Sequence, residues 1–371
     1  MSLSKSFQQT LAFSGKGLFV LLLVVLSSAA LVLDWLSGRA LNPAISLTLP
    51  LWTSTLAAAG LGYWVIPLLR KLKAGQFIRE DGPQTHLKKA GTPTMGGIFF
   101  VPAALSVAVV WSGVVAGAFP TEVLAVTALT LVFGFVGWLD DWQVLRRQSN
   151  QGISARLRLG LEVGSSLLFC LWLAEHQPDI TTLAFPFGFA LPLGFLFWFL
   201  AIFVATAESN AVNLTDGLDG LAAGTTAIAF LGLGALIAPT WPQLMIFCSC
   251  LSGGCLGFLA HNYNPARVFM GDTGSLALGG ALAAVGLISN TLWGLLILSG
   301  IFLVESLSVI AQVAYYKATK GPDGVGKRLF KMSPIHNHFE LTGWPETQIV
   351  GVFYGMSGLL ALLCLGLNYF S

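Results

Sequence analysis

The chain has 371 residues, of which 55% are hydrophobic and only 10% are charged, and its mean hydropathy is +0.77. This composition excludes an ordinary soluble domain, in which about a quarter of the residues are charged. The formal net charge of +2 is too small to indicate a nucleic-acid partner.

Long apolar segments recur along the whole chain. A helix needs about 20 apolar residues to cross a bilayer, and helices satisfy their own backbone polar groups in lipid. We therefore predict an all-α integral membrane protein, a polytopic bundle of about 10–11 transmembrane helices with catalytic cytoplasmic loops. The expected spans are 17–36, 51–69, 96–116, 120–139, 159–175, 188–207, 220–238, 242–260, 276–290, 293–316 and 346–368. Residues 1–371 are treated as one domain, with residues 1–50 as an N-terminal anchor region.

The charged residues crowd into a few loops between these spans. Eleven spans place the N-terminus and all of these motif-bearing loops on one side, together with 18 of the 19 Lys and Arg residues. Only Arg39 falls on the opposite side. By the positive-inside rule the basic side is cytoplasmic. We expect a multi-pass protein of the cytoplasmic (inner) membrane whose active site faces the cytoplasm.

Two adjacent carboxylates, Asp140 and Asp141, follow the fourth expected span. A charge is costly in the bilayer centre, so the pair is expected near the interface. Adjacent carboxylates repel each other and are stabilised by a cation. The plain alternative is a solvated helix end that is partly neutralised by Arg146 and Arg147.

Three further polar residues, Asn213, Asp216 and Asp219, are spaced by three. A helix would place them on one face, whereas Gly217 and Gly220 favour a turn that leads into a helix. In either case oxygen ligands and backbone N–H groups converge, which suits a sugar, a uracil or a phosphate–metal group.

Asp272 lies just before another apolar segment. Helix N-termini attract phosphates, and Mg²⁺ typically takes one or two carboxylates together with substrate phosphates. Asp272 with Asp140 or Asp141 would provide such a metal site. Capping of the following helix is the alternative role.

Two other segments carry weaker signals. Gly91–Gly97 is rich in glycine and follows Lys89, which could supply charge to a phosphate. His336 and His338 lack the additional ligands of a zinc site, so phosphate or carboxylate binding is the favoured interpretation. Glu305 lies inside an apolar span and needs a partner or a place in the protein interior, and its role stays open.

Taken in order, Thr92–Gly97, Asp140–Asp141, Asn213–Asp219 and Asp272 resemble the polyprenyl-phosphate N-acetylhexosamine-1-phosphate transferase superfamily. The segment Ser333–Leu341, followed by Gly343-Trp344, resembles its phospho-N-acetylmuramoyl-pentapeptide transferase branch. The resemblance covers about residues 70–350, the motif-bearing core, and leaves residues 1–50 outside.

This resemblance implies transfer of phospho-N-acetylmuramoyl-pentapeptide from UDP-N-acetylmuramoyl-pentapeptide to undecaprenyl phosphate, giving lipid I and UMP in the first membrane step of peptidoglycan synthesis. It implies Mg²⁺ as cofactor and membrane lipid as surroundings, and it leaves a homodimer open. Asp272 would hold Mg²⁺, and Asp140 or Asp141 would act as base or share the metal. Residues that match nucleoside or pocket positions are Asp216, Asp219, Asn262, Asn213, Lys89, Thr94 and Phe269, the last as the ring on which uracil stacks. His336 and His338 would border the site and contact phosphate or the muramoyl part.

Three positions depart from the family pattern. Asn337 stands where the family usually has the second of three histidines, and Val144 and Gln151 replace two lysines. These departures weaken individual assignments of phosphate contacts and leave the assignments of the carboxylates unaffected.

Two alternatives remain at this point. A sister transferase would use UDP-N-acetylglucosamine with a polyprenyl phosphate, and the histidine segment argues against it. A secondary transporter would place polar groups near the midplane, usually with repeat symmetry, whereas here they lie at one face.

Overall fold

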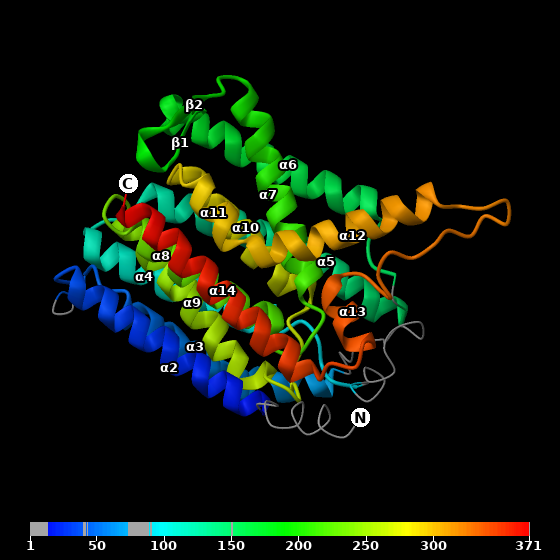
Figure 1. The fold of residues 1–371 in the computed structure, drawn as a ribbon. Coiled ribbons are helices and arrows are strands. Elements are labelled where there is room, and N and C mark those ends of the chain that lie inside the picture. Colours follow the sequence, from blue (N-terminus) through cyan, green and yellow to red (C-terminus); the bar gives the residue numbers. More distant parts are fainter. Residues whose placement is uncertain are drawn as a thin grey trace.

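The computed structural model describes residues 14–39, 42, 44–72, 89, 91–149 and 151–370. These residues form long helices that lie side by side, with a small β-hairpin at one end (Figure 1). The helices are α2 (Gly15–Leu36), α3 (Thr48–Lys71), α4 (Gly97–Ala116), α5 (Thr121–Arg147), α6 (Ala155–His176), α7 (Leu196–Thr215), α8 (Leu221–Ile237), α9 (Pro242–Asn262), α10 (Gly271–Ile288), α11 (Leu292–Leu298), α12 (Gly300–Ala318), α13 (Ile335–Leu341) and α14 (Glu346–Tyr369). The hairpin consists of β1 (Thr182–Ala184) and β2 (Ala190–Pro192), with Leu183 paired to Leu191.

Ten of the described helices are long and apolar enough to cross a membrane, and α8 is a shorter apolar helix. The predicted all-α, polytopic membrane fold is therefore confirmed. Lys5, Lys73, Arg79 and Lys88, which contributed to the predicted orientation, lie outside the described residues. The cytoplasmic orientation stays a prediction.

Helices α9 and α10 form the interior of the bundle. In their most apolar windows 94% and 89% of the residues are buried, against at most 44% in the other eight long spans. Glycines make this packing close: a side chain at Gly253 or Gly257 of α9 would collide with backbone carbonyl oxygens of α3. Small residues let helix backbones approach in this way in membranes, where apolar burial alone gives little preference for one neighbour.

Three expected spans differ in detail from the structure. The span predicted over 188–207 begins only at Leu196, because residues 182–192 turn back as the β-hairpin. The span predicted over 293–316 is broken between α11 and α12, where the adjacent Ser299 and Gly300 permit a bend. Helix α5 continues to Arg147, six residues past Asp141, with two arginines near its negative C-terminal end.

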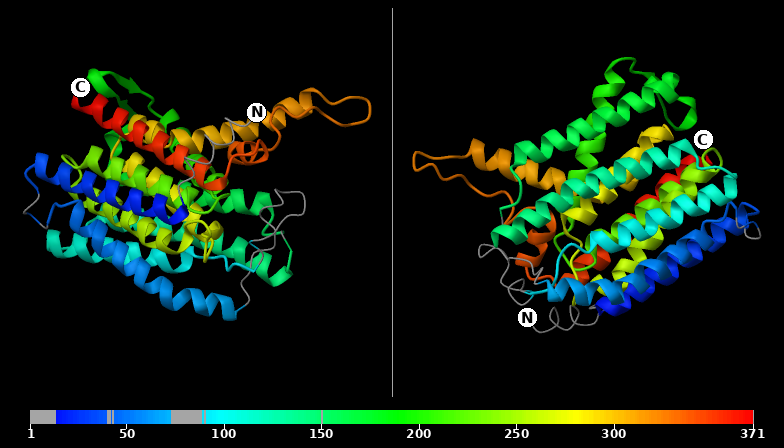
Figure 2. Two further views of the ribbon diagram at one scale, coloured as in Figure 1. Left: turned by 60° about the horizontal axis from the view of Figure 1, so that its bottom comes forward. Right: turned by 180° about the vertical axis from the view of Figure 1, so that it is seen from behind.

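The helix ends that carry the predicted motifs meet at one end of the bundle, as the views from two sides show (Figure 2). Glycines again permit the contact. A side chain at Gly137 of α5 would collide with the carbonyl oxygen of Asp272, and one at Gly97 of α4 would collide with the backbone of Gly274. The N-terminus of α10 is therefore held between α5 and α4.

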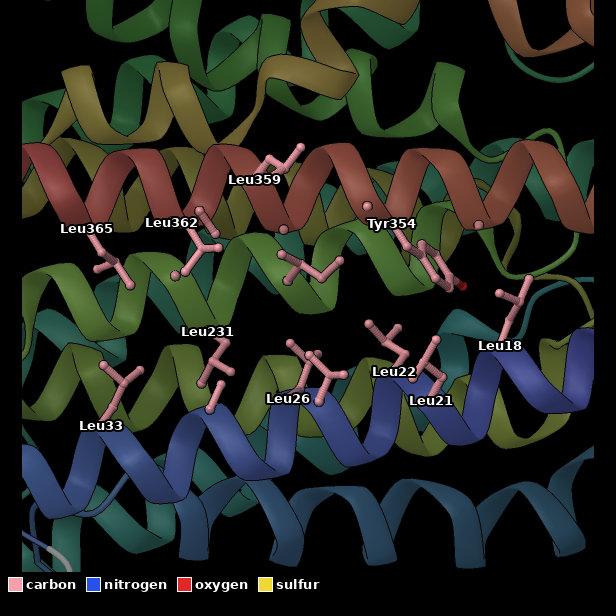
Figure 3. Close-up of a pocket in the computed structure, with 18 residues that line it drawn as sticks. Leu18, Leu21, Leu22, Leu26, Leu33, Leu231, Tyr354, Leu359, Leu362 and Leu365 are labelled. Atoms are coloured by element: carbon pink, nitrogen blue, oxygen red, sulfur yellow. The ribbon is translucent and has the colours of Figure 1, made fainter. Parts of the chain in front are cut away.

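A cavity of about 430 Å³ lies between α2, α8 and α14, lined almost entirely by aliphatic side chains. Figure 3 shows leucines of α2 and α14 pointing into it from opposite sides. Tyr354 lines one end, and its hydroxyl donates a hydrogen bond to the carbonyl oxygen of Gly220 at 2.7 Å. The predicted site residues do not line this cavity, which belongs to the apolar part of the bundle.

Candidate active site

Asp141 holds the N-terminus of α10. Its Oδ1 accepts a hydrogen bond from the backbone N–H of Asp272 at 3.1 Å, and its Oδ2 accepts from the backbone N–H of Thr273 at 3.0 Å and from the Thr273 hydroxyl at 2.6 Å. Gly271, at φ = 73°, leaves the carboxylate room, since a side chain there would crowd Oδ2 of Asp141. Asp141 thus performs, from α5, the capping that sequence analysis considered for Asp272 itself.

Asp272, in the first turn of α10, faces Arg158 of α6 and Asn213 of α7. Its Oδ2 lies 2.7 Å from Nη1 of Arg158, and its Oδ1 accepts a hydrogen bond from Nδ2 of Asn213 at 2.8 Å. Arg158 also binds Glu162 through Nε at 3.1 Å and donates from Nη2 to Asn210 and Asn213. Two helices, α6 and α7, thus bring polar side chains to one carboxylate of α10.

Asp140 and Asp216 lie around the same carboxylate. Asp140 is half-buried, its Oδ1 accepts a hydrogen bond from the backbone N–H of Ile153 at 3.0 Å, and it lies within electrostatic range of Asp272 and Arg158. Asp216 follows the last turn of α7. Burial, together with the charges of Asp272, Asp141 and Asp219, raises the pKa of Asp216 to about 8. Accumulated negative charge of this kind is typical of a site that receives a cation.

Asp219 belongs to a different arrangement, which we call the Lys89 cluster (Lys89, Asp219, Asn264 and Glu346). Nζ of Lys89 lies 2.8 Å from Asp219 and 2.6 Å from Glu346, and Asn264 donates to both carboxylates. Backbone N–H groups of Asp219 and Ala266 complete the set. Burial lowers the pKa of Lys89, but the charges of Glu346 and Asp219 outweigh it, so that the pKa of the ammonium lies above its usual value.

Thr94 and Phe269 lie on two segments that bind each other through their backbones. The N–H of Phe269 donates to the carbonyl oxygen of Pro93, and the N–H of Gly96 donates to the carbonyl oxygen of Phe269, each at 2.8 Å. Thr94 is buried and Phe269 half-buried. Asn262 connects a third segment, accepting from the N–H of Gly220 at 3.0 Å and donating to the carbonyl oxygen of Val268 at 2.9 Å.

The two histidines of α13 are held differently. His336 is 1% exposed, and its Nδ1 lies 3.1 Å from Oε2 of the equally buried Glu305 of α12. Nδ1 of His338 accepts a hydrogen bond from the backbone N–H of Lys331 at 3.1 Å. The partner that Glu305 needs inside an apolar span is therefore His336.

Glu162 and Asn210 were not predicted from the sequence as site residues, and neither were three further residues. Arg158 was read only as a basic residue that indicates topology, and Asn264 and Glu346 were not considered. Arg158 has one local partner, Glu162, four residues away. The other partners lie 45 to 257 residues away along the chain, so no local spacing could reveal them. The roles predicted for individual site residues stay predictions.

The donor set fits a magnesium ion that keeps part of its water. Within the described residues no three His, Cys, Asp or Glu side chains gather into a set that could hold a metal alone. Mg²⁺ needs only one or two carboxylates besides water and substrate phosphate. Asp272 and Asp140 could supply these carboxylates. Both oxygens of Asp272 accept hydrogen bonds from Arg158 and Asn213, whose side chains could turn aside, whereas two of the donors to Asp141 are backbone N–H groups of α10.

Comparison with known proteins gives consistent results along the chain. Residues 123–290 match glycosyl transferase family 4, and residues 89–101 match the phospho-N-acetylmuramoyl-pentapeptide-transferase signature 1. The phospho-N-acetylmuramoyl-pentapeptide-transferase of Acaryochloris marina is 64% identical over 369 residues, which cover 99% of each chain. That of Nostoc punctiforme is 65% identical over 360 residues, covering 96% of this chain and 98% of its own.

The alignment with the Acaryochloris marina protein extends past the motif-bearing core into residues 1–50. These residues lie outside the range over which the motifs alone resemble the family. Sequence identity of 64–65% over nearly the whole length shows that this chain and these transferases share a common ancestor. The chain belongs to the phospho-N-acetylmuramoyl-pentapeptide transferase family.

Proposed function

We propose that this membrane enzyme transfers phospho-N-acetylmuramoyl-pentapeptide from its UDP-linked donor to undecaprenyl phosphate, releasing UMP and forming lipid I. Family membership supports the reaction. The observation that carries it is the group of carboxylates around Asp272 at one end of an apolar helix bundle, held by Arg158 and Asn213. Both substrates bring phosphate, and a carboxylate-rich site binds phosphate through a cation.

The cation that suits this site is Mg²⁺, with Asp272 and Asp140 as the residues that would hold it. When bound, it would neutralise the diphosphate and stabilise the UMP leaving group. Asp141 keeps the N-terminus of α10, and with it Asp272, in place. Asn213 and Arg158 fix the direction of the Asp272 carboxylate.

Phosphoryl transfer depends mostly on positioning and electrostatics. Asp140 accepts one backbone hydrogen bond on Oδ1, so of the adjacent pair it is the better candidate to share the metal or to accept a proton from the lipid phosphate. Arg158, already anchored by Glu162, offers a planar guanidinium of the kind that binds phosphate. Arg158 would supply positive charge to phosphate in a chain that has Val144 and Gln151 at two positions where the family usually has lysine.

The nucleoside would lie near Phe269, whose half-buried ring suits stacking against uracil, with Thr94 and Asn213 nearby in the same pocket. We assign Asp219, Asn262 and Lys89 chiefly to shaping this pocket, because their polar atoms already bind protein partners. The site would face the cytoplasm of the inner membrane, so that the nucleotide sugar arrives from water and the lipid phosphate arrives laterally.

The decisive experiment is UMP release by the purified protein in detergent. The protein would receive UDP-N-acetylmuramoyl-pentapeptide and a polyprenyl phosphate, with Mg²⁺ or with EDTA. We expect UMP only when the lipid phosphate and Mg²⁺ are both present. Release from UDP-N-acetylglucosamine instead would assign the chain to the sister activity, and silence with both donors would contradict the proposal.

A further inference from the structure

Glu305 is a buried acid that the proposed chemistry does not use. It lies in the membrane-spanning helix α12 and is 0% exposed. Its Oε2 lies 3.1 Å from Nδ1 of His336, within ion-pair distance, and within the described residues neither carboxylate oxygen has a hydrogen-bond donor in good geometry. An acid inside a membrane protein is costly and usually serves a defined partner. For Glu305 that partner is the Nδ1 edge of the His336 ring.

The opposite edge of the same ring meets the connection between α7 and α8, residues 216–220. A side chain at Gly217 would collide with Nε2 of His336, so the glycine leaves room for the ring. Asp216 precedes this contact and Asp219 follows it. The ring therefore lies between an acid of the membrane interior and the turn that carries two of the predicted substrate residues.

The proximity of the Glu305 carboxylate favours hydrogen on Nδ1, because the negative oxygen attracts the N–H dipole. A carboxylate at Nδ1 keeps the hydrogen there, whether or not the ring is charged, and leaves Nε2 as the edge presented to the turn. His338, two residues along the same short helix, shows the reverse: its Nδ1 accepts from Lys331, so its hydrogen lies on Nε2. The two histidines therefore provide an internal comparison.

We propose that Glu305 is a positioning residue, which holds His336 through Nδ1–H so that Nε2 supports the 216–220 turn and faces the substrate beside it. A partner of this kind fixes both the tautomer and the orientation of a functional histidine. The part of the proposal that concerns substrate rests on the proposed transferase function. The part that concerns the ring does not.

The first test is spectroscopic and needs no activity. In protein labelled with ¹⁵N-histidine, the His336 signals, assigned by their loss in His336→Ala, should show hydrogen on Nδ1. Glu305→Leu should change this tautomer, while the signals of His338 stay as they are. The matched control is Glu208→Gln, which removes another acid of a membrane-spanning helix, one bound by Ser299 instead of a histidine. The proposal would be overturned if His336 of the wild-type protein carried hydrogen only on Nε2. It would also be overturned if Glu305→Leu left the tautomer of His336 unchanged.

The second test separates positioning from folding. Glu305→Leu should lower kcat for UMP release by about 10- to 100-fold, the range typical when the partner that orients a functional histidine is removed. KM for the UDP-linked donor should change little, and Glu305→Gln, which keeps an acceptor oxygen, should restore part of the rate. In a His336→Ala background, Glu305→Leu should cause no further loss. Losses that multiply would show that Glu305 acts independently of His336.

Thermal stability gives a third readout. His336→Ala leaves Glu305 buried without its partner and should lower the melting temperature, and adding Glu305→Leu should recover part of it. A further fall in the double variant would contradict the pairing. If the wild-type protein released no UMP, the proposed function would fail, whereas the tautomer and stability results would still decide the role of Glu305.

Discussion

Two groups of acids lie close together in this molecule and differ in their balance of charge. In the Lys89 cluster, Lys89 and Asn264 bind both carboxylates, and backbone N–H groups fill the remaining places. The second group, which we call the Asp272 cluster, contains Asp140, Asp141, Asp216, Asp272 and Glu162. Within the described chain, Arg158 is the one basic side chain ion-paired with it. The Lys89 cluster, with one ammonium for two carboxylates, is the more nearly balanced group and can fix helices in place. The Asp272 cluster, with one guanidinium for five acids, is suited to receive a cation and phosphate.

The largest effect should follow a change at the centre of the unbalanced group. Asp272→Asn keeps the shape of the side chain but removes the charge that would hold Mg²⁺ and pair with Arg158. We expect kcat/KM for UMP release to fall roughly a thousandfold, as for loss of a main electrostatic contact in a transition state. Elution as a single species and an unchanged helical circular dichroism spectrum would show that the protein is folded. Activity above a tenth of wild type would remove Asp272 from the metal site.

Variants of the adjacent residues Asp140 and Asp141 should separate a loss of activity from a loss of stability. Asp141→Ala removes three hydrogen bonds to the N-terminus of α10 and should lower the free energy of unfolding by about 1–2 kcal/mol, as for loss of a helix cap. Asp140→Ala removes one backbone contact and should lower turnover with a smaller change in stability. Melting temperature and UMP release measured on both variants test the assignment. Equal loss of stability in the two variants would contradict it.

A smaller effect is expected in the balanced group. Glu346→Gln keeps the side chain able to accept hydrogen bonds from Lys89 and Asp219 but removes one charge. Asp219 still pairs with Lys89, and removing the charge of Glu346 relieves its repulsion with Asp219. We therefore expect the free energy of unfolding to change by no more than about 1 kcal/mol, well below the loss for breaking a whole buried pair. Urea or thermal unfolding would measure it. A loss of activity without a loss of stability would instead place Glu346 at the substrate.

The sequence shows which residues matter better than it shows what each one does. Apolar length and the one-sided basic residues predict the bundle, because lipid imposes a nearly uniform requirement on every span. Asp272 could likewise be located from its place before an apolar helix. Asp140 and Asp141 have adjacent positions in the sequence but different partners, since neighbouring helical residues point about 100° apart.

The long-range side-chain pairs and the helix break depend on tertiary packing, which cannot be read from the local sequence. Arg158 reaches Asp272 across 114 positions, and Lys89 reaches Glu346 across 257. Arg158 and Glu346 lie near the ends of α6 and α14, helices whose mainly apolar composition conceals these polar ends. The break between α11 and α12 was missed for a related reason, because hydropathy continues smoothly across Ser299.

The smallest expected effect is the response of the Asp272 cluster to pH. In the folded protein the pKa of Asp216 is raised to about 8 from its ordinary value of 3.8. Because the unfolded chain loses this proton near pH 4 and the folded chain only near pH 8, Asp216 costs stability that grows as pH rises between these values and is constant above. In EDTA, the stability advantage of Asp216→Asn over wild type should therefore increase from pH 6 to pH 8 and then level off. Added Mg²⁺ should reduce the increase, because a nearby cation favours the ionised acid. An advantage that does not change with pH would mean that burial and the surrounding acids do not act on Asp216.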